Sequence, residues 1–417
     1  MKTVSVHPLT RVEGHGRVDL MLRDGEVVDA RVAITESPRL FEGLMRGRDG
    51  REVPALVCRI CAICSAVHRV AACRALEEAL DVQVAPLAEA IRELLVLGGH
   101  IESHALHLFC LVLPDVAGEA SILDLLRADN DAARQGLALK ELGNAIQEVA
   151  GGRAIHPINA EVGGVLVRPD REQLQALQPR IDEGRRQIER LQENFFQPDS
   201  FPPASSVEAT RIAVTGAEDL SLWAEELSLS GGRNMPVGEY RRVLAERPVV
   251  YSNARHCRDG KTPFFTGALA RLELSSEGQS LLAGAGSLPS GIHANNAAQC
   301  LEITWALQRC SVLIREVMQA EADAPLQAPV RPGAGAGTAA VEAPRGLLVH
   351  HYVLDDLGRV AVADVITPTA INQAAMEEQL RSDLQGQTDE SILRDRAERI
   401  VRSFDPCISC SVHLIRP

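Results

Sequence analysis

Two Cys-x-x-Cys pairs near opposite ends of this 417-residue chain constrain its fold more than any other feature. Cys61 and Cys64 form the first pair, and Cys407 and Cys410 form the second, close to the C-terminus. Each pair can bind a metal through two thiolates, so folding one end onto the other would assemble four sulfur ligands. Such soft ligands select zinc, nickel or iron over magnesium or calcium. We therefore expect a single unit in which the two ends of the chain meet.

The composition argues against several classes of protein. Lys and Arg total 43 against 56 Asp and Glu, and the net charge of −13 disfavours nucleic-acid binding. We find no unbroken apolar run of the length that a membrane span needs, and no signal-peptide pattern at the N-terminus. The ten cysteines form no regular disulfide framework. In a chain that resembles a cytoplasmic protein, close cysteine pairs favour metal binding over disulfide bonds. The sequence thus predicts a cytoplasmic protein with no membrane span.

Hydrophobic periodicity predicts a mixed fold dominated by helices. Alternating apolar residues on both sides of Asp24-Gly25 predict a β-hairpin within the first 35 residues. Apolar residues at three- and four-residue spacing predict long helices. These helices cover residues 66–80, 86–112, 133–150, 171–195 and 296–320.

The C-terminal third has a different pattern. Residues 324–345, rich in Ala, Gly and Pro, predict a loop. Strands are expected at 347–353 and 359–366, and helices at 371–385 and 390–402. The fold class is therefore an α-rich α+β fold, with a long-helix bundle as core and small β elements near both termini. One unit, 1–417, would comprise an N-terminal segment with the hairpin (1–50), a helical core (51–325) and a mixed C-terminal segment (326–417).

The residues around the cysteines suggest more than a structural zinc site. Structural zinc pairs are usually about 15–20 residues apart, whereas these pairs are separated by most of the chain. Arg59 and Asp405 each precede the first cysteine of a pair by two residues, and His68 and His413 follow the second. Charged and hydrogen-bonding groups of this kind orient thiolate ligands and exchange protons. A zinc-stabilised scaffold nevertheless stays open as an alternative.

These motifs resemble the two signatures of nickel–iron hydrogenase large subunits, Arg-x-Cys-x-x-Cys-x-x-x-His and Asp-Pro-Cys-x-x-Cys-x-x-His. The resemblance covers nearly the whole chain. Further matching stretches are Arg11-Val-Glu-Gly-His15, Phe41-Glu42, Ser103-His104-Ala-Leu-His107, Ala343-Pro-Arg-Gly346 and Thr367-Pro-Thr369. The details are most similar to the soluble NAD(P)-linked branch that includes the sulfhydrogenases.

The resemblance implies a nickel–iron centre with one CO and two cyanide ligands on iron, which cleaves H2 reversibly and heterolytically into protons and electrons. Cys61 and Cys407 would bind nickel alone, and Cys64 and Cys410 would bridge nickel and iron. Glu13 would relay the proton from Cys407, although by itself it could be a surface carboxylate.

The resemblance also implies roles around the metals. Arg345 and Pro344 would lie over the open coordination position, close to one cyanide, and Thr369 would hydrogen-bond the other. His68 would hydrogen-bond the Cys64 thiolate. The alternatives are an ordinary salt bridge for Arg345 and a helix cap for Thr369.

A second cation, magnesium or iron, would be bound by Glu42, the carbonyl of Val365 and His413. Residues 414–417 would be removed by a maturation protease after nickel insertion, as is common in this family.

His100, His104 and His107 lie at helical spacing on one face. They could form a metal face or a proton wire, but we favour buried histidines that hydrogen-bond the motif loops. At position 103 this chain has Ser, whereas many relatives have Asp.

Six other cysteines have no cluster-like spacing: Cys58, Cys73, Cys110, Cys257, Cys300 and Cys310. We therefore expect no iron–sulfur cluster in this chain. Electrons would leave through an iron–sulfur small subunit, and from there through flavin and iron–sulfur subunits to NAD(P). The alternatives are a heterodisulfide-reductase-type partner, or a zinc-stabilised subunit without catalytic activity.

Overall fold

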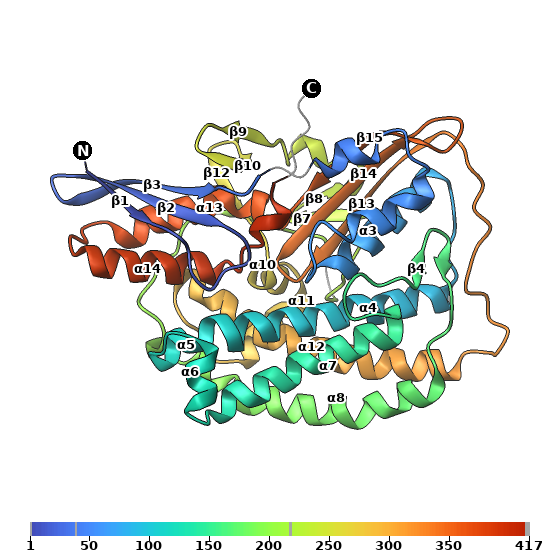
Figure 1. Cartoon of the computed structure of the whole chain (residues 1–417), viewed down its shortest axis with the longest axis horizontal. Helices are drawn as coiled ribbons and strands as arrows, with labels where there is room; N and C mark the ends of the chain where they lie inside the picture. The colour runs from blue at the N-terminus through green and yellow to red at the C-terminus, as the bar shows by residue number, and fades with distance from the viewer. Residues whose placement is uncertain (1, 38–39, 217–218, 413–417) are drawn as a thin grey trace.

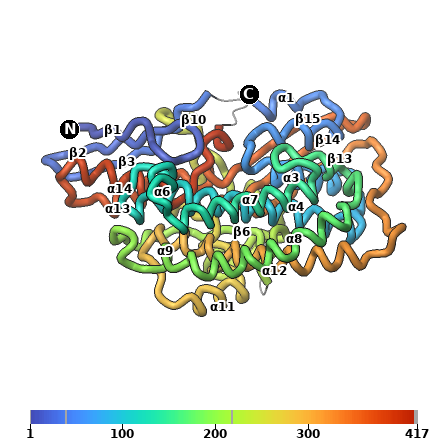
Figure 2. The backbone as a smooth tube through the Cα atoms, turned by 60° about the horizontal axis from the view of Figure 1, so that its bottom comes forward, coloured from blue at the N-terminus to red at the C-terminus, as the bar shows by residue number. Residues whose placement is uncertain are grey.

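Four long helices form the body of the computed structural model, which describes residues 2–37, 40–216 and 219–412. They run side by side along the lower half of Figure 1, and Figure 2 shows the same layer from another side. The helices are α4 (Pro86–Ala105), α7 (Asp131–Gly151), α8 (Arg171–Leu191) and α12 (Ala294–Gln319). Their apolar faces form one large core, so the expected α-rich α+β fold with a helical bundle is confirmed.

The central helix α4 continues without a break into a π-helix, η2 (Leu106–Val112), and then into α5 (Leu113–Ala117). By length and composition alone the run Pro86–Ala117 could cross a membrane, although charged residues such as Glu89, Arg92 and Glu102 interrupt it. However, 89% of its most apolar window is buried inside the protein. It is the central helix of the core.

The N-terminal hairpin is present and is widened by a third strand. β2 (Gly16–Arg23) and β3 (Glu26–Ile34) pair antiparallel, and β1 (Lys2–Val6) adds to the free edge of β2. Both residues of the predicted turn have positive φ, 53° for Asp24 and 88° for Gly25, as a tight hairpin turn requires. The helices α13 (Pro368–Leu384) and α14 (Glu390–Ser403) pack on this sheet.

A second antiparallel sheet, β13 (Gly335–Ala343), β14 (Gly346–Leu354) and β15 (Val360–Ile366), lies against α3 (Ser65–Ala79). The prediction of a loop over 324–345 was therefore wrong for residues 335–343. The glycines in this strand face the helix at very short range. A Cβ atom on Gly337 would lie 2.1 Å from the carbonyl oxygen of Ala75, so the composition that suggested a loop serves close packing.

A five-stranded sheet within residues 210–265 was not anticipated, because its strands are too short to show a period. The sheet order is β11-β12-β6-β7-β8. Its strands are β6 (Thr210–Ala213), β7 (Glu226–Leu229), β8 (Arg233–Pro236), β11 (Arg258–Asp259) and β12 (Thr262–Phe265). The remaining α-helices and strands are α1 (Phe41–Met45), α2 (Val53–Val57), α6 (Ile122–Arg127), β4 (Ala160–Glu161), β5 (Gly164–Val165), α9 (Glu193–Phe196), β9 (Arg247–Val249), β10 (Ser252–His256), α10 (Ala268–Leu274) and α11 (Ser276–Gly284).

Replacing Gly337 by alanine tests the close packing of β13 on α3. The new Cβ would collide with helix backbone, which cannot move independently, so Gly337→Ala should lower the free energy of unfolding by about 1–3 kcal/mol. Gly333→Ala is the matched control, because no atom lies within 4 Å of its Cβ position. Urea unfolding followed by circular dichroism measures both, and equal stability of the two variants would contradict this account.

Candidate metal centre

The four cysteine sulfurs come together at one buried point, although they belong to opposite ends of the chain. All four Sγ atoms lie within 4.8 Å of one another. The Sγ of Cys407 lies 2.8 Å from that of Cys410 and 3.4 Å from that of Cys61. Each cysteine is nearly inaccessible to solvent. This arrangement can hold a metal or a pair of metals through thiolates.

The first pair is shaped by the start of helix α3. Cys64 is the residue that precedes this helix, and its backbone N–H donates to the Sγ of Cys61 at 3.2 Å. The N-terminus of α3, the positive end of its dipole, therefore lies next to this cysteine pair. A helix N-terminus stabilises negative charge, so this position favours thiolates.

The second pair is held by the N-terminal segment. Glu13 and Cys407 form a parallel β-bridge, and the N–H of Ile408 donates to the carbonyl of Glu13 at 3.1 Å. Gly14 allows this close approach, since its φ is 86° and a Cβ there would lie 2.7 Å from the Cβ of Ile408. On the other side, the Cys407 N–H donates to the hydroxyl of Thr369 at 2.8 Å.

Arg345 provides the positive charge beside the sulfurs. Its Nη1 donates to the Sγ of Cys64 at 3.3 Å, and its Nε donates to Asp405 at 3.0 Å. Burial opposes the charge of the guanidinium, but Asp405 and the neighbouring cysteines raise the pKa of Arg345 well above its ordinary value. Arg59, which the sequence also suggested as a nearby cation, is exposed.

The thiols compete for protons because they lie so close together. Hydrogen bonding from Cys407 and Cys410 lowers the pKa of Cys61 well below the usual thiol value. In turn, contact with Cys410 and Cys61 raises the pKa of Cys407 well above it. Four negative sulfurs cannot share one buried point without added positive charge. The site is therefore suited to a cation that binds all four.

A buried ion network fixes the segment that carries Arg345. Arg271 forms two hydrogen bonds with Glu302, both at 2.6 Å, and one with Glu342 at 2.8 Å. It also donates to the carbonyls of Ala343 and Pro344, at 2.9 and 3.0 Å. The turn before Arg345 is thus held by a single arginine that the sequence did not single out.

The three histidines on α4 and η2 are buried and hydrogen-bonded, as expected. Nε2 of His100 donates to the carbonyl of Glu342 at 3.0 Å, and Nε2 of His107 donates to that of Arg402 at 2.8 Å. His104 contacts Glu302 at 2.9 Å. Burial, followed by the charge of Arg271, lowers the pKa of His100 to about 3, so this histidine is neutral.

The remaining predicted site residues occupy several positions around the cluster. The Glu13 carboxylate accepts hydrogen bonds from the backbone N–H and the hydroxyl of Ser409. Nδ1 of His68 lies 3.1 Å from Nε2 of His350. The buried Glu42 accepts from the Val365 N–H at 3.0 Å, and burial raises its pKa to about 7. His413 lies outside the described residues, as do residues 414–417.

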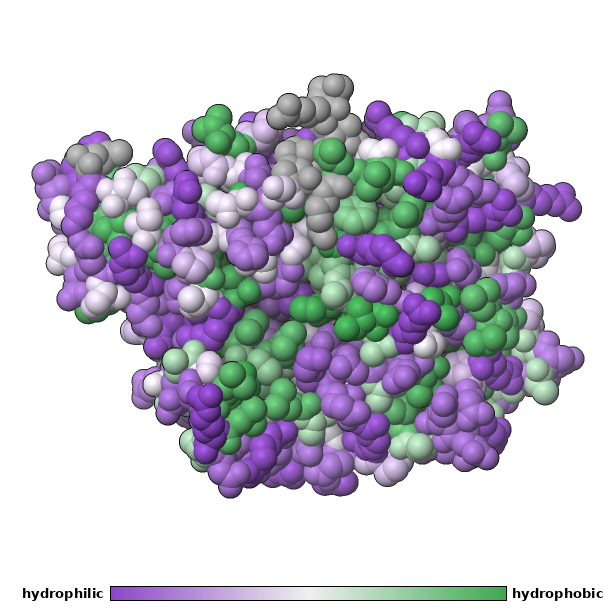
Figure 3. All heavy atoms as spheres, in the orientation of Figure 1, coloured by the Kyte–Doolittle hydropathy of each residue, from purple (hydrophilic) through white to green (hydrophobic). Residues whose placement is uncertain are grey.

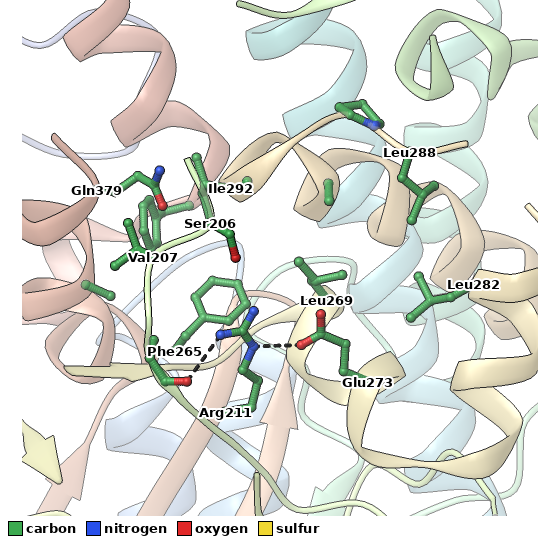
Figure 4. A pocket seen from close by; sticks show the side chains of 16 residues that line it. Ser206, Val207, Arg211, Phe265, Leu269, Glu273, Leu282, Leu288, Ile292 and Gln379 are labelled. Atoms are coloured by element: carbon green, nitrogen blue, oxygen red, sulfur yellow. Dashed lines mark hydrogen bonds and ion pairs between the residues drawn. The ribbon is translucent and has the colours of Figure 1, made fainter. Parts of the chain in front are cut away.

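A cavity of about 300 Å³, lined in part by Phe404 and by none of the cysteines, lies apart from the sulfurs. Figure 4 shows Arg211 at its wall, bonded to Glu273 at 2.7 Å and to the carbonyl of Ala209 at 3.2 Å. The ring of Phe265 packs edge-to-face on Phe404. The lining is mainly apolar, and the one arginine in it already has an acidic partner.

The Arg271 network predicts a large stability effect. Arg271→Met would leave the carboxylates of Glu302 and Glu342 buried without their cation, and should lower the free energy of unfolding by about 3–5 kcal/mol. Arg233→Met, which breaks a half-exposed pair with Asp259, should cost less than about 1 kcal/mol. Urea unfolding compares the two, and similar losses would contradict the proposed importance of Arg271.

Comparisons with known proteins agree with this geometry. A family model described as nickel-dependent hydrogenase matches residues 39–144 and 290–413, and a HoxL-like model matches residues 3–37. The chain is 39% identical to sulfhydrogenase 2 subunit alpha of Pyrococcus furiosus, over 99% of both chains. It is 25% identical to the NAD-reducing hydrogenase HoxS subunit beta of Cupriavidus necator, over 98% of this chain and 94% of that one.

The fold gives the same result. A crystal structure of an NAD+-reducing NiFe hydrogenase in the H2-reduced state superimposes with a TM-score of 0.88 and 28% identity. The match covers 99% of this chain and 100% of that chain. The chain therefore belongs to the nickel-dependent hydrogenase family, as a large, catalytic subunit.

Proposed function

We propose that this subunit cleaves H2 reversibly and heterolytically at a nickel–iron centre, and passes the electrons through an iron–sulfur small subunit to NAD(P). The observation that carries the proposal is the meeting of four buried cysteine sulfurs within 4.8 Å, with Arg345 beside them. When bound, the metal pair supplies the redox chemistry of H2. The residues of the chain hold the metals, exclude water and move the protons.

The donor set fits a nickel–iron centre better than a structural zinc site. Cys61 and Cys407 would bind nickel alone, and Cys64 and Cys410 would also bind iron. Buried charge at a zinc site is usually balanced by the metal itself, whereas here Arg345 and Asp405 add an ion pair with a bond of 3.0 Å. The Arg345 guanidinium, which Asp405 holds 3.3 Å from the Sγ of Cys64, suits a centre with further anionic ligands, and we propose two cyanides and one CO on the iron.

Arg345, Pro344 and Thr369 would define the surroundings of those ligands. Arg345 keeps its charge and offers several donors, as recognition of an anion requires. Thr369 holds the backbone of Cys407 through its hydroxyl oxygen, so the O–H hydrogen stays available to another acceptor. His68 would hydrogen-bond the Cys64 thiolate and so stabilise its negative charge.

Glu13 would take the proton from Cys407. Its backbone is paired with that of Cys407, and its carboxylate is oriented by two hydrogen bonds from Ser409. The proton would leave the Sγ of Cys407 and form an O–H bond on the Glu13 carboxylate. A positioned carboxyl group is an effective proton relay.

A second cation, magnesium or iron, would be bound by Glu42, the carbonyl of Val365 and His413. Glu42 is buried against the backbone of Val365, where a cation would offset its burial. Residues 414–417 would be removed by a maturation protease once nickel is in place.

An exposed apolar surface near the first cysteine pair supports docking of the small subunit. The segment 152–168 exposes four large apolar residues: Ile155, Ile158, Leu166 and Val167. It is anchored near the cysteines, because His156 contacts the carbonyl of Cys58 and the hydroxyl of Ser65, both at 3.0 Å. Figure 3 shows apolar side chains gathered between polar ones on the face that it draws. Such surfaces favour protein contacts.

Metal analysis of a cysteine variant tests the metal site. Cys407→Ala removes one of four ligands and should lower bound nickel at least about tenfold and abolish H2 activity. Cys310→Ala, at a buried position outside the group of four cysteines, should keep both. The intact enzyme should contain nickel and iron and absorb in the infrared where CO and cyanide on iron do. Zinc alone, without those bands, would favour the scaffold alternative.

The electron acceptor is tested with the complex purified through this subunit. We expect H2-dependent reduction of NAD+ or NADP+ and co-purification of flavin and iron–sulfur subunits, because an NAD-reducing hydrogenase subunit and an NAD+-reducing NiFe hydrogenase are among the proteins that this chain is similar to. Absorbance at 340 nm measures this activity. Reduction of a heterodisulfide without reduction of NAD(P) would favour the alternative partner.

A further inference from the structure

Three buried polar atoms on the packed helices α4 and α7 have no hydrogen-bond partner among the residues that the structure describes. They are Oε2 of Glu102, Oγ of Ser103 and Oε1 of Gln147. Glu102 and Ser103 are on α4, and Gln147 is on α7, which packs closely against it. Buried polar atoms are almost always satisfied, and ordered water is the usual partner when protein groups are missing.

Gly99 leaves space for that water. It lies one helical turn before Glu102 and Ser103, whose side chains lean back toward that turn. A Cβ atom on Gly99 would lie 3.5 Å from Oε1 of Gln147 and 3.9 Å from the Cβ of Ala66. Ala66 follows Cys64 by two residues in α3. Gly99 therefore lies where α3, α4 and α7 meet, close to the start of the helix that follows Cys64.

The other oxygen of Glu102 leads toward solvent. Its Oε1 lies 3.0 Å from Nζ of Lys140, and the side chains of Glu102 and Lys140 are 7% and 27% exposed. Lys140, Gly143 and Gln147 share one face of α7 at three- and four-residue spacing. A Cβ on Gly143 would lie 2.4 Å from the backbone nitrogen of Glu102, so the two helices are in direct contact here.

The charges around Glu102 favour proton exchange. Burial raises the pKa of its carboxyl group, Lys140 and Arg345 lower it, and Cys64 raises it again, with a net increase. Cys110 is the other titratable group nearby, since both Lys140 and Glu102 act on it. Glu102 is thus a buried carboxyl group that keeps its proton to higher pH than an exposed one.

We propose that Glu102 and Lys140 form a second proton exit from the cysteine cluster, separate from Glu13. A proton leaves an Sγ–H bond, crosses ordered water beside Ser103 and Gln147, and forms the Oε2–H bond of Glu102. Lys140 gives one of its protons to bulk water and recovers one from Glu102, so the pair returns to its starting charge. This inference rests on the proposed H2 chemistry.

The two routes are associated with different cysteine motifs. Glu13 is paired with Cys407 on the N-terminal segment, whereas Glu102 is influenced by Cys64 and Arg345. Removing one carboxyl should therefore leave the other route working. This makes the effect of Glu102 most visible once Glu13 has been removed.

Exchange between D2 and solvent protons in the purified complex tests the second exit. Glu13→Gln should slow exchange by about 10²-fold and leave a measurable remainder. Adding Glu102→Gln should lower that remainder by about another tenfold. Adding Gly99→Ala to Glu13→Gln should also lower the remaining exchange by about tenfold. Its methyl group fits at van der Waals distances but fills the space that the water would occupy. Adding Glu148→Gln, on the exposed side of α7, should change nothing.

An infrared titration provides a readout that does not depend on the metals. The spectrum of wild type minus Glu102→Gln should contain a protonated C=O band that persists to higher pH than those of exposed carboxyls. In Gly99→Ala this band should shift, because its hydrogen bond to water is lost. Absence of nickel and of exchange in the wild type would refute the proposed function and leave this band unaffected.

The second exit is overturned by any of three results. The first is a Glu13→Gln enzyme with no remaining exchange. The second is equal D2 exchange rates in two double variants, Glu13→Gln with Glu102→Gln and Glu13→Gln with Glu148→Gln. The third is the absence of the Glu102 band at elevated pH.

Discussion

The site depends on the contact between the N-terminal segment and the second cysteine motif. Glu13 pairs with Cys407 through backbone hydrogen bonds, and Gly14 permits the close approach. Asp115 reinforces the contact, because it binds both Arg11 near one end and Arg402 near the other. Without these contacts the four sulfurs would not meet. The Asp115 carboxylate thus links the partly buried Arg11 of the N-terminal segment to the buried Arg402 that precedes the second cysteine motif.

Charge balance explains why positive groups surround the four sulfurs. Four buried thiolates are unfavourable unless positive charge lies close to them. The metals, Arg345 and the start of α3 would provide this charge, and Asp405 and Arg271 fix Arg345 and its turn in place. The helical bundle packs around the four cysteines, which are nearly inaccessible to solvent.

The sequence predicted the parts that depend on local patterns. The cysteine spacing, the Asp24-Gly25 turn and the long helices all have periods or motifs that act over a few residues. Strand β13 was missed because its glycines are explained only by the backbone of α3, which is remote in sequence. Arg271 and Asp115 were missed because an isolated arginine or aspartate carries no signal until the fold supplies its partners. The resemblance to hydrogenases pointed to Glu13 and Arg345, which geometry alone would have ranked lower.

X-ray absorption at the nickel edge of the purified complex tests the central claim most directly, because it reports the atoms bound to nickel. This account predicts nickel surrounded by four cysteine sulfurs, with iron as the next heavy neighbour. Nickel bound mainly by nitrogen or oxygen, or nickel with no iron nearby, would contradict it.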